Sequence, residues 1–365
     1  MLILILTLCI YAILISWLIV GWRKTKEFIE DENTDKNCKA TIVVACKNEA
    51  QKLPHLLQAL ANQSNQNFQL ILVDDNSTDN SFEIMQLSKE FSDMLILKSS
   101  RTGKKQALKT GIEQASNEFI ITTDADCQPV STWLQSIYAF HNQYNPDLII
   151  GPVEIKSPTT FFEALQQLEF QTLIASGAGA AGNNQAIMCN GANLAFHKSD
   201  WLAHYNAIKP HLQSGDDVFL LHTLKREQRN IQFLKSKKAM VFTSACSTLK
   251  QFYKQRKRWA SKAPSYSDTT TIIVALIILG VNTMLFFLAI ASIINHNYIV
   301  YLLVSVSTKF LIDWYFIGQT NHIFENKKTV RSIVALTVVY PFYIVISAFA
   351  GIAQGLNDKH TNDNR

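Results

Sequence analysis

The sequence predicts an α/β fold of the doubly wound type together with membrane-spanning α-helices, and two patterns support this. Between residues 40 and 122, short apolar runs of strand type alternate with segments whose apolar residues have helical spacing. This alternation is typical of a parallel sheet covered by helices. Elsewhere, four apolar runs of about 20 residues are each long enough to cross a bilayer. These runs cover residues 2–22, 271–294, 298–317 and 330–353.

The individual elements follow from the local spacing of apolar residues. Strands are expected at residues 40–46, 68–73, 95–97, 118–122 and 148–153. Helices are expected at residues 50–61, 81–91, 104–115, 133–144 and 218–224. Residues 161–174 also have near-helical apolar spacing, and for them packing in a core is favoured over a helix lying on the membrane.

The apolar runs divide the 365 residues into consecutive parts. These are an N-terminal transmembrane helix at 1–23, a cytosolic domain at 24–267 with a juxtamembrane segment at 249–262, three transmembrane helices within 268–354, and a polar tail at 355–365. The second part is long enough to bury its own core, and the tail is expected to be disordered. The first run has no basic residue before it, so an uncleaved anchor is favoured over a signal peptide.

The net charge is +5, and basic residues gather beside the apolar runs. They are Arg23, Lys24 and Lys26 after the first run, Lys250, Lys254, Arg256, Lys257, Arg258 and Lys262 before the second, and Lys327, Lys328 and Arg331 around the start of the fourth. The loop at 296–297 contains neither Lys nor Arg. The positive-inside rule therefore predicts a cytosolic domain and both termini on the outer side. Nucleic-acid binding is not indicated, because the charge follows the membrane ends.

Asp124-Ala125-Asp126 directly follows an expected strand. Two carboxylates one residue apart in a turn can hold a hard cation through oxygen ligands, and such a cation can neutralise a departing diphosphate. A solvated turn is the alternative for this short motif alone. A second carboxylate pair, Asp74-Asp75, also ends a strand, which favours the functional interpretation.

The pair Asp74-Asp75 suits hydrogen bonds from a ribose or a base edge, while capping of the next helix is the simpler alternative. Both carboxylate pairs end strands of the expected parallel sheet, so they are expected at one sheet edge, where ligands bind. The turn Arg101-Thr102-Gly103-Lys104-Lys105 opens a helix and suits an anion, although a solvated basic turn is equally compatible with it.

Two later turns are candidates for the acceptor side of a site. Asn190-Gly191-Ala192-Asn193 offers amides to sugar hydroxyls, or is an ordinary turn. Ser214-Gly215-Asp216-Asp217 precedes an apolar helix, where a carboxylate either caps the helix or removes a proton from an attacking hydroxyl. The sequence leaves both alternatives open.

Gln255-Arg256-Lys257-Arg258-Trp259 lies just before the second apolar run. An arginine can bind a diphosphate through two hydrogen bonds, and a tryptophan can stack on a sugar or lie at a membrane interface. A juxtamembrane cluster of positive charge explains part of this segment, but it requires neither Gln255 nor Trp259.

In this order, the motifs resemble those of membrane-bound family 2 glycosyltransferases with a GT-A fold. The matching segments are Val44 to Ala50 in the opening strand, Gly103-Lys104 to Gly111 for G-K-x-x-A-L-x-x-G, Asp124-Ala125-Asp126 for D-x-D, Asp216-Asp217 where the family often has E-D, and Gln255, Arg258 and Trp259 for Q-x-x-R-W. One helix before and three after the domain resemble the ceramide-glucosyltransferase-like branch.

The resemblance implies an inverting transfer from a nucleotide sugar to a membrane lipid or lipid-linked acceptor. Asp217 would be the catalytic base, and Asp216 beside it stands where the family often has Glu. Asp124 and Asp126 would hold Mg²⁺ or Mn²⁺. The donor would be bound by Lys47, Glu49, Asp74, Asp75, Lys104, Asp124, Gln255, Arg258 and Trp259. The acceptor would be bound by Asn190, Gly191, Asn193 and Trp259.

Two other functions remain open at this point. A small processive polysaccharide synthase would carry the same motifs, although four crossings provide few helices to line a polymer channel. A non-catalytic transport or scaffold protein with a nucleotide-binding domain is the second alternative. The apolar runs argue against transport, because Asp313 is interpreted as their exceptional ionisable residue and is expected at the membrane interface, next to Trp314 and Tyr315.

Overall fold

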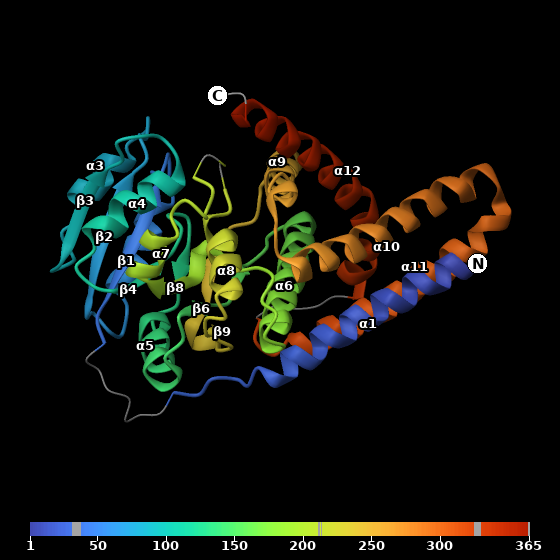
Figure 1. Ribbon diagram of the computed structural model, residues 1–365, viewed down its shortest axis with the longest axis horizontal. Coiled ribbons are helices and arrows are strands. Elements are labelled where there is room, and N and C mark those ends of the chain that lie inside the picture. Colours follow the sequence, from blue (N-terminus) through green and yellow to red (C-terminus); the bar gives the residue numbers. More distant parts are fainter. Residues whose placement is uncertain (31–37, 211, 213, 325–329, 364–365) are drawn as a thin grey trace. The chain divides into compact units, whose positions relative to one another are not determined.

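The computed structural model describes residues 1–30, 38–210, 212, 214–324 and 330–363 (Figure 1). The chain forms two compact units, each made of segments that are distant in the sequence. Unit 1 consists of Met1–Lys24, Ser157–Asn183 and Ala245–Arg365, and unit 2 consists of Thr25–Lys156 and Asn184–Ser244. The expected domain at 24–267 therefore differs from unit 2 at three places, because residue 24 and residues 157–183 and 245–267 belong to unit 1.

Unit 2 contains a seven-stranded sheet in the order β3-β2-β1-β4-β8-β6-β9, which Figure 1 shows from one edge to the other. Its strands are β1 (Ala40–Cys46), β2 (Phe68–Asp74), β3 (Met94–Lys98), β4 (Phe119–Thr122), β6 (Leu148–Ile150), β8 (Leu194–His197) and β9 (Ile231–Phe233). The central strand β1 pairs in parallel with β2 and β4, and β2 pairs in parallel with β3. The expected parallel half of the sheet is thus confirmed.

The sheet as a whole is mixed, which corrects the expectation of a purely parallel one. β8 lies antiparallel between β4 and β6. The expected strand at 148–153 is broken in two, because the chain leaves the sheet at Gly151-Pro152. β6 stays in the large sheet, while β7 (Val153–Ile155) joins β5 (Gln128–Pro129) and β10 (Val241–Thr243) in a three-stranded sheet. A Cβ at Gly151 would lie 2.2 Å from the Asn193 side chain, so only glycine fits at the break.

The helices of unit 2 cover the sheet and close the loops. They are α2 (Leu53–Ala61), α3 (Ser81–Leu87), α4 (Lys104–Gln114), α5 (Trp133–Tyr144), α7 (Lys198–Ala203) and α8 (Asp216–Arg226), with 3₁₀ turns η1 (Gly191–Asn193) and η2 (Lys237–Ala239). β2 is buried along its whole length, as is usual for a central strand covered on both faces. α4 packs closely on the sheet, because a Cβ at Gly111 would lie 2.6 Å from Val43 and 2.9 Å from Val73.

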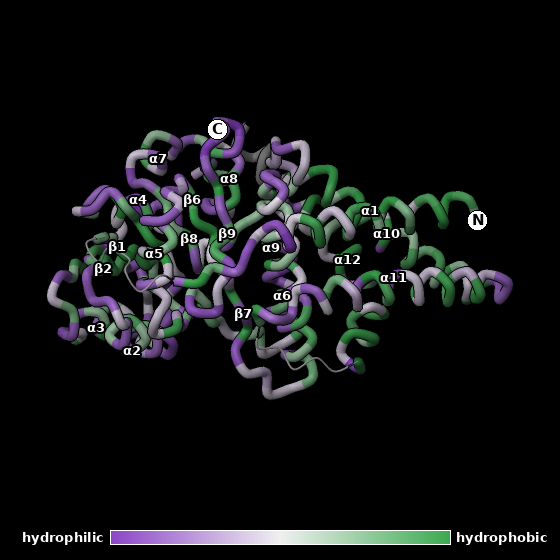
Figure 2. The backbone as a smooth tube through the Cα atoms, turned by 90° about the horizontal axis from the view of Figure 1, so that it is seen from below, coloured by the Kyte–Doolittle hydropathy of each residue, from purple (hydrophilic) through white to green (hydrophobic). Residues whose placement is uncertain are grey.

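Unit 1 is helical. Its elements are α1 (Leu2–Lys24), α6 (Phe161–Gly182), α9 (Leu249–Ala260), η3 (Ala263–Ser265), α10 (Thr269–Ile294), η4 (His296–Tyr298), α11 (Ile299–Thr320) and α12 (Val330–Asp363). Four helical segments among the described residues are long and apolar enough to cross a membrane: Leu2–Lys24, Thr269–Ile294, His296–Thr320 and Val330–Leu356. Figure 2 shows the hydrophobic colour extending along α1 and α10.

α6 packs with the apolar helices of unit 1, and this determines the environment of the stripe at 161–174. Leu168 forms a buried cluster with Ile317 of α11 and Ile333 of α12. At its other end, α6 meets α1 backbone to backbone, since a Cβ at Gly21 would lie 1.7 Å from the carbonyl oxygen of Gly179. Of the apolar residues at 161–174, Leu168, Phe170 and Ile174 are buried, whereas Phe161 at the start of α6 is exposed. The burial of Leu168 is against membrane-type helices and not in the core of the α/β domain.

The apolar helices contain a second ionisable residue, Lys309, which corrects the interpretation of Asp313 as the exception. Lys309 Nζ lies 2.5 Å from Asp313 Oδ2, one helical turn away, and Tyr11 of α1 donates a hydrogen bond to Asp313 Oδ1 at 2.5 Å. Lys309 is buried. Asp313 therefore takes part in a contact between helices, and its expected position at the membrane interface stays a prediction.

Two expectations concern the ends of loops and helices. The tail at 355–365 is not irregular where the structure describes it, because α12 continues to Asp363. Gly355 allows close packing at the start of this extension, since a Cβ there would lie 2.2 Å from the carbonyl oxygen of Ser261. Lys327 and Lys328, used to predict the topology, lie outside the described residues.

Candidate active site

The two carboxylate pairs lie at the carboxyl ends of two parallel strands of the same sheet, as the sequence predicts. β2 ends at Asp74 and β4 ends two residues before Asp124, with β1 between these strands. The backbone amide of Asp75 donates to the carbonyl oxygen of Cys46, the last residue of β1, at 2.7 Å. The sheet itself therefore fixes the position of the acidic turn after β2.

Asp75 connects three of the predicted segments. Its Oδ1 accepts a hydrogen bond from the backbone amide of Gly103 at 2.6 Å, and its Oδ2 lies 3.7 Å from Lys47 Nζ. Asp74 Oδ1 accepts a hydrogen bond from the amide of Ser77 at 3.2 Å, so part of its role is to hold the turn. Both carboxylates are buried, while Lys47 is exposed.

Glu49 and Asp126 are connected by Lys52, a residue that the motifs did not indicate. Lys52 Nζ lies 3.4 Å from Asp126 and 3.8 Å from Glu49. Burial raises the pKa of Glu49, an effect opposed by Lys52 and reinforced by Asp126. Lys52 follows the recognised opening segment by two residues, and only the fold shows that it reaches the D-x-D turn.

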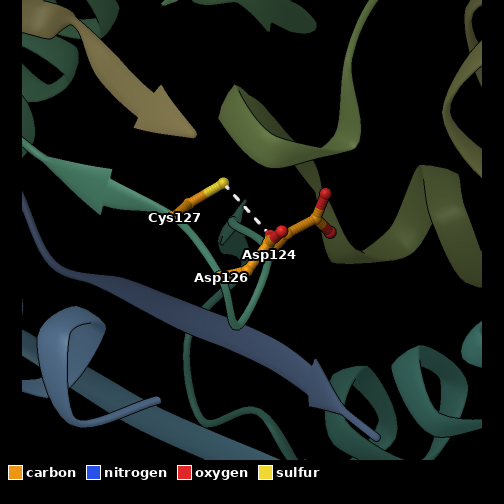
Figure 3. A group of neighbouring side chains, drawn as sticks. All are labelled: Asp124, Asp126 and Cys127. Carbon is orange, nitrogen blue, oxygen red and sulfur yellow. Dashed lines mark hydrogen bonds between the residues drawn. The ribbon is translucent and has the colours of Figure 1, made fainter. Parts of the chain in front are cut away.

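The D-x-D turn forms the candidate metal centre. Ligand atoms of Asp124, Asp126 and Cys127 all lie within 4.8 Å of one another, and Figure 3 shows the Cys127 sulfur facing Asp126. The carboxylates are partly exposed and fit a hard divalent cation. Burial raises the pKa of the Cys127 thiol well above its usual range, and Asp124 and Asp126 add to this. Sulfur is also a softer ligand than such an ion prefers.

Lys104 joins the D-x-D turn to the predicted base. Its Nζ lies 2.5 Å from Asp124 Oδ1, and its charge also acts on Asp216 and Asp217. Burial lowers the pKa of Lys104, but Asp124, Asp216 and Asp217 together outweigh this effect and the pKa is raised. Lys104 is therefore a permanent positive charge among these acids.

Asp216 and Asp217 begin α8, after Gly215 with a φ of +92°. Asp217 is partly exposed and its Oδ2 accepts a hydrogen bond from the amide of Gly191 at 3.1 Å. Asp216 is buried. Burial raises its pKa, Lys104 opposes this rise, and the negative charge of Asp217 adds to it.

Gly191 lines the space between these side chains. A Cβ there would lie 3.6 Å from Lys104 Nζ, 3.7 Å from Asp216 Oδ2 and 3.8 Å from Asp217 Cβ. The carbonyl oxygen of Gly191 accepts a hydrogen bond from Thr122 at the end of β4. The strand that leads to the D-x-D turn thus also holds the turn beside the predicted base.

The two asparagines of the 190–193 turn differ. Asn190 is partly exposed and its Oδ1 caps η1 by accepting from the amide of Ala192. Asn193 is buried, and its side-chain amide donates to Pro152 and Ala239 while its oxygen accepts from Trp133. Because these contacts use both ends of its amide, Asn193 holds the fold together, and its predicted contact with an acceptor stays a prediction.

Gln255, Arg258 and Trp259 lie on α9 of unit 1, whereas the other predicted site residues lie in unit 2. The Gln255 side chain accepts a hydrogen bond from Arg256, and the ring of Trp259 lies 4.3 Å from the guanidinium carbon of Arg256. Arg258 is exposed, and its guanidinium makes no hydrogen bond or ion pair with the residues that the structure describes.

Residues 41–203 match the family described as Glycosyl transferase family 2. Over these residues the chain is similar to family 2 glycosyltransferases. The matched range begins in β1 and includes both carboxylate pairs, Lys104 and the 190–193 turn. Asp216, Asp217 and the Q-x-x-R-W residues lie beyond it.

Curated relatives of the glycosyltransferase domain match over limited lengths. The undecaprenyl-phosphate 4-deoxy-4-formamido-L-arabinose transferase of Pseudomonas syringae pv. syringae is 36% identical over 94 residues, which are 24% of this chain and 28% of that protein. The poly-beta-1,6-N-acetyl-D-glucosamine synthase of Staphylococcus aureus is 27% identical over 148 residues, which are 40% of this chain and 35% of that protein. The matches thus span about a third of the length of these relatives.

A solved structure supports the GT-A fold. The mannosyltransferase PcManGT from Pyrobaculum calidifontis, solved with GDP-Man and Mn²⁺, matches with a TM-score of 0.54 and 14% sequence identity. The match covers 98% of this chain and 96% of that one. At this identity, the likeness concerns the fold alone.

Proposed function

We propose that the protein is an inverting glycosyltransferase that moves a sugar from a nucleotide-sugar donor to a membrane lipid or lipid-linked acceptor. The observation that carries this proposal is the convergence of Asp124, Lys104 and Asp217 around Gly191, at the sheet edge where the D-x-D turn begins. Ligands of open α/β sheets bind at such an edge. A partly exposed carboxylate beside a held turn is suited to take a proton from an attacking hydroxyl.

The residues of unit 2 divide the proposed chemistry between them. Asp74 and Asp75 bind the nucleoside, with Lys47 and Glu49 beside them. Asp124 and Asp126 hold Mg²⁺ or Mn²⁺, which when bound would neutralise charge on the leaving diphosphate. Lys104 orients Asp124 and keeps a positive charge near the base. Asp217 holds the proton removed from the acceptor hydroxyl, while Asn190 and Gly191 orient the acceptor.

For the residues of α9, the proposed role is donor binding. Arg258 is exposed and unpaired among the described residues, so its guanidinium is free to bind a diphosphate through two hydrogen bonds. Gln255 and Trp259 flank it at helical spacing, and Trp259 offers a ring to a sugar. The name of the undecaprenyl-phosphate transferase, together with four candidate membrane spans, favours a lipid-linked acceptor. We further propose that the catalytic domain is cytosolic and that both termini lie outside.

A processive synthase is the second candidate, because a relative named as a poly-beta-1,6-N-acetyl-D-glucosamine synthase matches over the longer stretch. The two candidates differ in product size. Purified protein in lipid vesicles would be supplied with a panel of nucleotide sugars and a lipid extract, and released nucleoside diphosphate and product length would be measured. We expect a discrete glycolipid. A ladder of long chains would favour the synthase, and no release with any donor would contradict both candidates.

A further inference from the structure

Arg256 lies within the Q-x-x-R-W segment, at a position that the motif leaves unspecified. α9 begins after Thr248, whose hydroxyl accepts from the amide of Gln251, and it buries Phe252 and Arg256. These two residues are four positions apart and therefore share one face of the helix. An arginine is rarely buried so fully unless it is paired. The inward position of Arg256 therefore calls for a partner.

That partner is Glu169 of α6. Arg256 Nε donates to Glu169 Oε1 at 3.1 Å and Nη2 donates to Oε2 at 2.5 Å, so both carboxylate oxygens are engaged. The exposed fractions of the two side chains are 6% and 9%. Burial lowers the pKa of Arg256, but the charge and hydrogen bonds of Glu169 outweigh it and raise the pKa. The paired guanidinium is thus a fixed and charged group.

The fixed guanidinium contacts both neighbouring motif residues. Its Nη1 donates a hydrogen bond to Gln255 Oε1. Its carbon lies 4.3 Å from the centre of the Trp259 ring and 4.4 Å from that of Phe252. Such stacking of a planar guanidinium on an aromatic face restrains the ring. The ring of Phe170, the residue next to Glu169 on α6, has its centroid 6.3 Å from that of the Trp259 ring.

We propose that Arg256, held by Glu169, is a positioning residue that sets the side chains of Gln255 and Trp259 for glycosyl transfer. This inference rests on the proposed function, in which these two motif residues contact the donor and the acceptor. The two arginines of the segment then have separate tasks. Arg258 faces solvent to bind a ligand, and Arg256 faces inward to orient the residues on either side of Arg258.

A purely structural role would give the pair a different behaviour. If Arg256 and Glu169 only joined α9 to α6, two apolar side chains of similar size would serve as well, since replacing a buried ion pair in this way is often neutral or stabilising. The double variant Glu169→Met/Arg256→Met therefore separates the two roles. It removes both charges together and leaves no buried charge without a partner.

The first experiment measures unfolding temperature and turnover of this double variant in detergent. We expect an unfolding temperature close to that of the parent and a fall in kcat of about 10- to 100-fold, because small misplacements of orienting groups have effects of that size. The matched control is Lys39→Met/Asp93→Asn, which removes an exposed pair in unit 2 and should change neither quantity. A folded double variant with parental turnover would overturn the proposal.

A milder series decides the question if the double variant does not fold. Arg256→Lys keeps the charge but loses the planar fork, and it is combined with Trp259→Ala. We expect Arg256→Lys to lower turnover about tenfold in the parent and less than about twofold in the Trp259→Ala background, since residues that act through one another are not additive. If the effects of Arg256→Lys and Trp259→Ala on turnover multiplied in the double variant, the inference would be overturned. Parental turnover of Trp259→Ala alone would instead contradict the proposed function of the motif.

Discussion

Charged side chains are arranged in opposite ways in the two units. In unit 2, one lysine, Lys104, contacts Asp124 and also faces Asp216 and Asp217. In unit 1, the buried charges form one-to-one pairs, Arg256 with Glu169 and Lys309 with Asp313. The comparison teaches that the same residue types serve two purposes. Around Lys104 the carboxylates outnumber this lysine, so a further positive charge would be bound favourably there. In the pairs of unit 1 each charge is already balanced by its partner.

The largest expected effect is on the acidic side of the comparison. Asp217→Asn keeps the size of the side chain but cannot accept a proton, so turnover should fall by about 10²- to 10⁴-fold, the range for loss of a general base. Nucleotide binding, measured by calorimetry, should be retained. Asp93→Asn, an exposed carboxylate, is the control. A near-parental rate for Asp217→Asn would transfer the role to Asp216.

The demand for a positive charge is tested directly by metal binding. Asp126→Ala should remove most turnover and most Mn²⁺ binding, read as the free-ion signal in electron paramagnetic resonance, because one of two hard ligands is lost. Cys127→Ser should leave Mn²⁺ binding unchanged, because sulfur is a softer ligand than this ion prefers. Full turnover of the parent in excess chelator would show that these carboxylates do not serve to hold a divalent cation.

The matched pairs of unit 1 predict an effect on stability. Lys309→Met leaves Asp313 without its charge partner in an apolar helix, which should destabilise unit 1 by about 3–5 kcal/mol. Lys309→Met/Asp313→Leu removes both charges and should recover most of this loss. Thermal unfolding in detergent measures both variants. If the double variant were as unstable as the single one, the pair would not be the balanced contact described here.

The smallest expected effect concerns His141, which belongs neither to the acidic cluster of unit 2 nor to the charge pairs of unit 1. Burial lowers the pKa of His141, as does the nearby His197, and its ring stacks on Phe119 with centroids 4.1 Å apart. The unfolded chain therefore binds a proton more readily, so stability should fall as the pH drops below about 6.5, the usual pKa of histidine. His141→Phe keeps the stacking and should reduce this slope. Unfolding temperatures between about pH 5 and 8 test it; an unchanged slope would assign the effect to other groups.

The sequence allowed much of the fold to be predicted, because local patterns determine it. The segment at 133–144 was predicted with the bounds of α5. Asp74 ends β2 and Asp124 follows β4, and these parallel strands on either side of β1 have their carboxyl ends at one edge of the sheet. The break at Gly151 was missed, although the Gly151-Pro152 dipeptide interrupts the apolar run and is a usual sign of a break. Lys309 was also overlooked within an apolar run, although its spacing of four from Asp313 is visible in the sequence.

Site residues were predictable where a motif marks them, and less so where tertiary contacts decide. Lys52 reaches Asp126 only through the fold. In the sequence, Asn193 resembles a ligand-binding amide. In the structure, its side chain is hydrogen-bonded to the buried Trp133 and to two backbone carbonyl groups. Arg256 reads as one more juxtamembrane charge, and only its contact with Glu169, 87 residues earlier in the chain, distinguishes it from its exposed neighbours.

The contact between α1 and α6 has a consequence for the folding of the protein during its synthesis. Besides the glycine contact, the Asn183 side chain donates a hydrogen bond to the carbonyl oxygen of Trp17 at 2.7 Å, across 166 residues of chain. At usual rates of synthesis, the ribosome needs roughly 8–33 seconds for that distance. The packing of α1 against α6 therefore forms only after the intervening strands have been made and α6 has emerged.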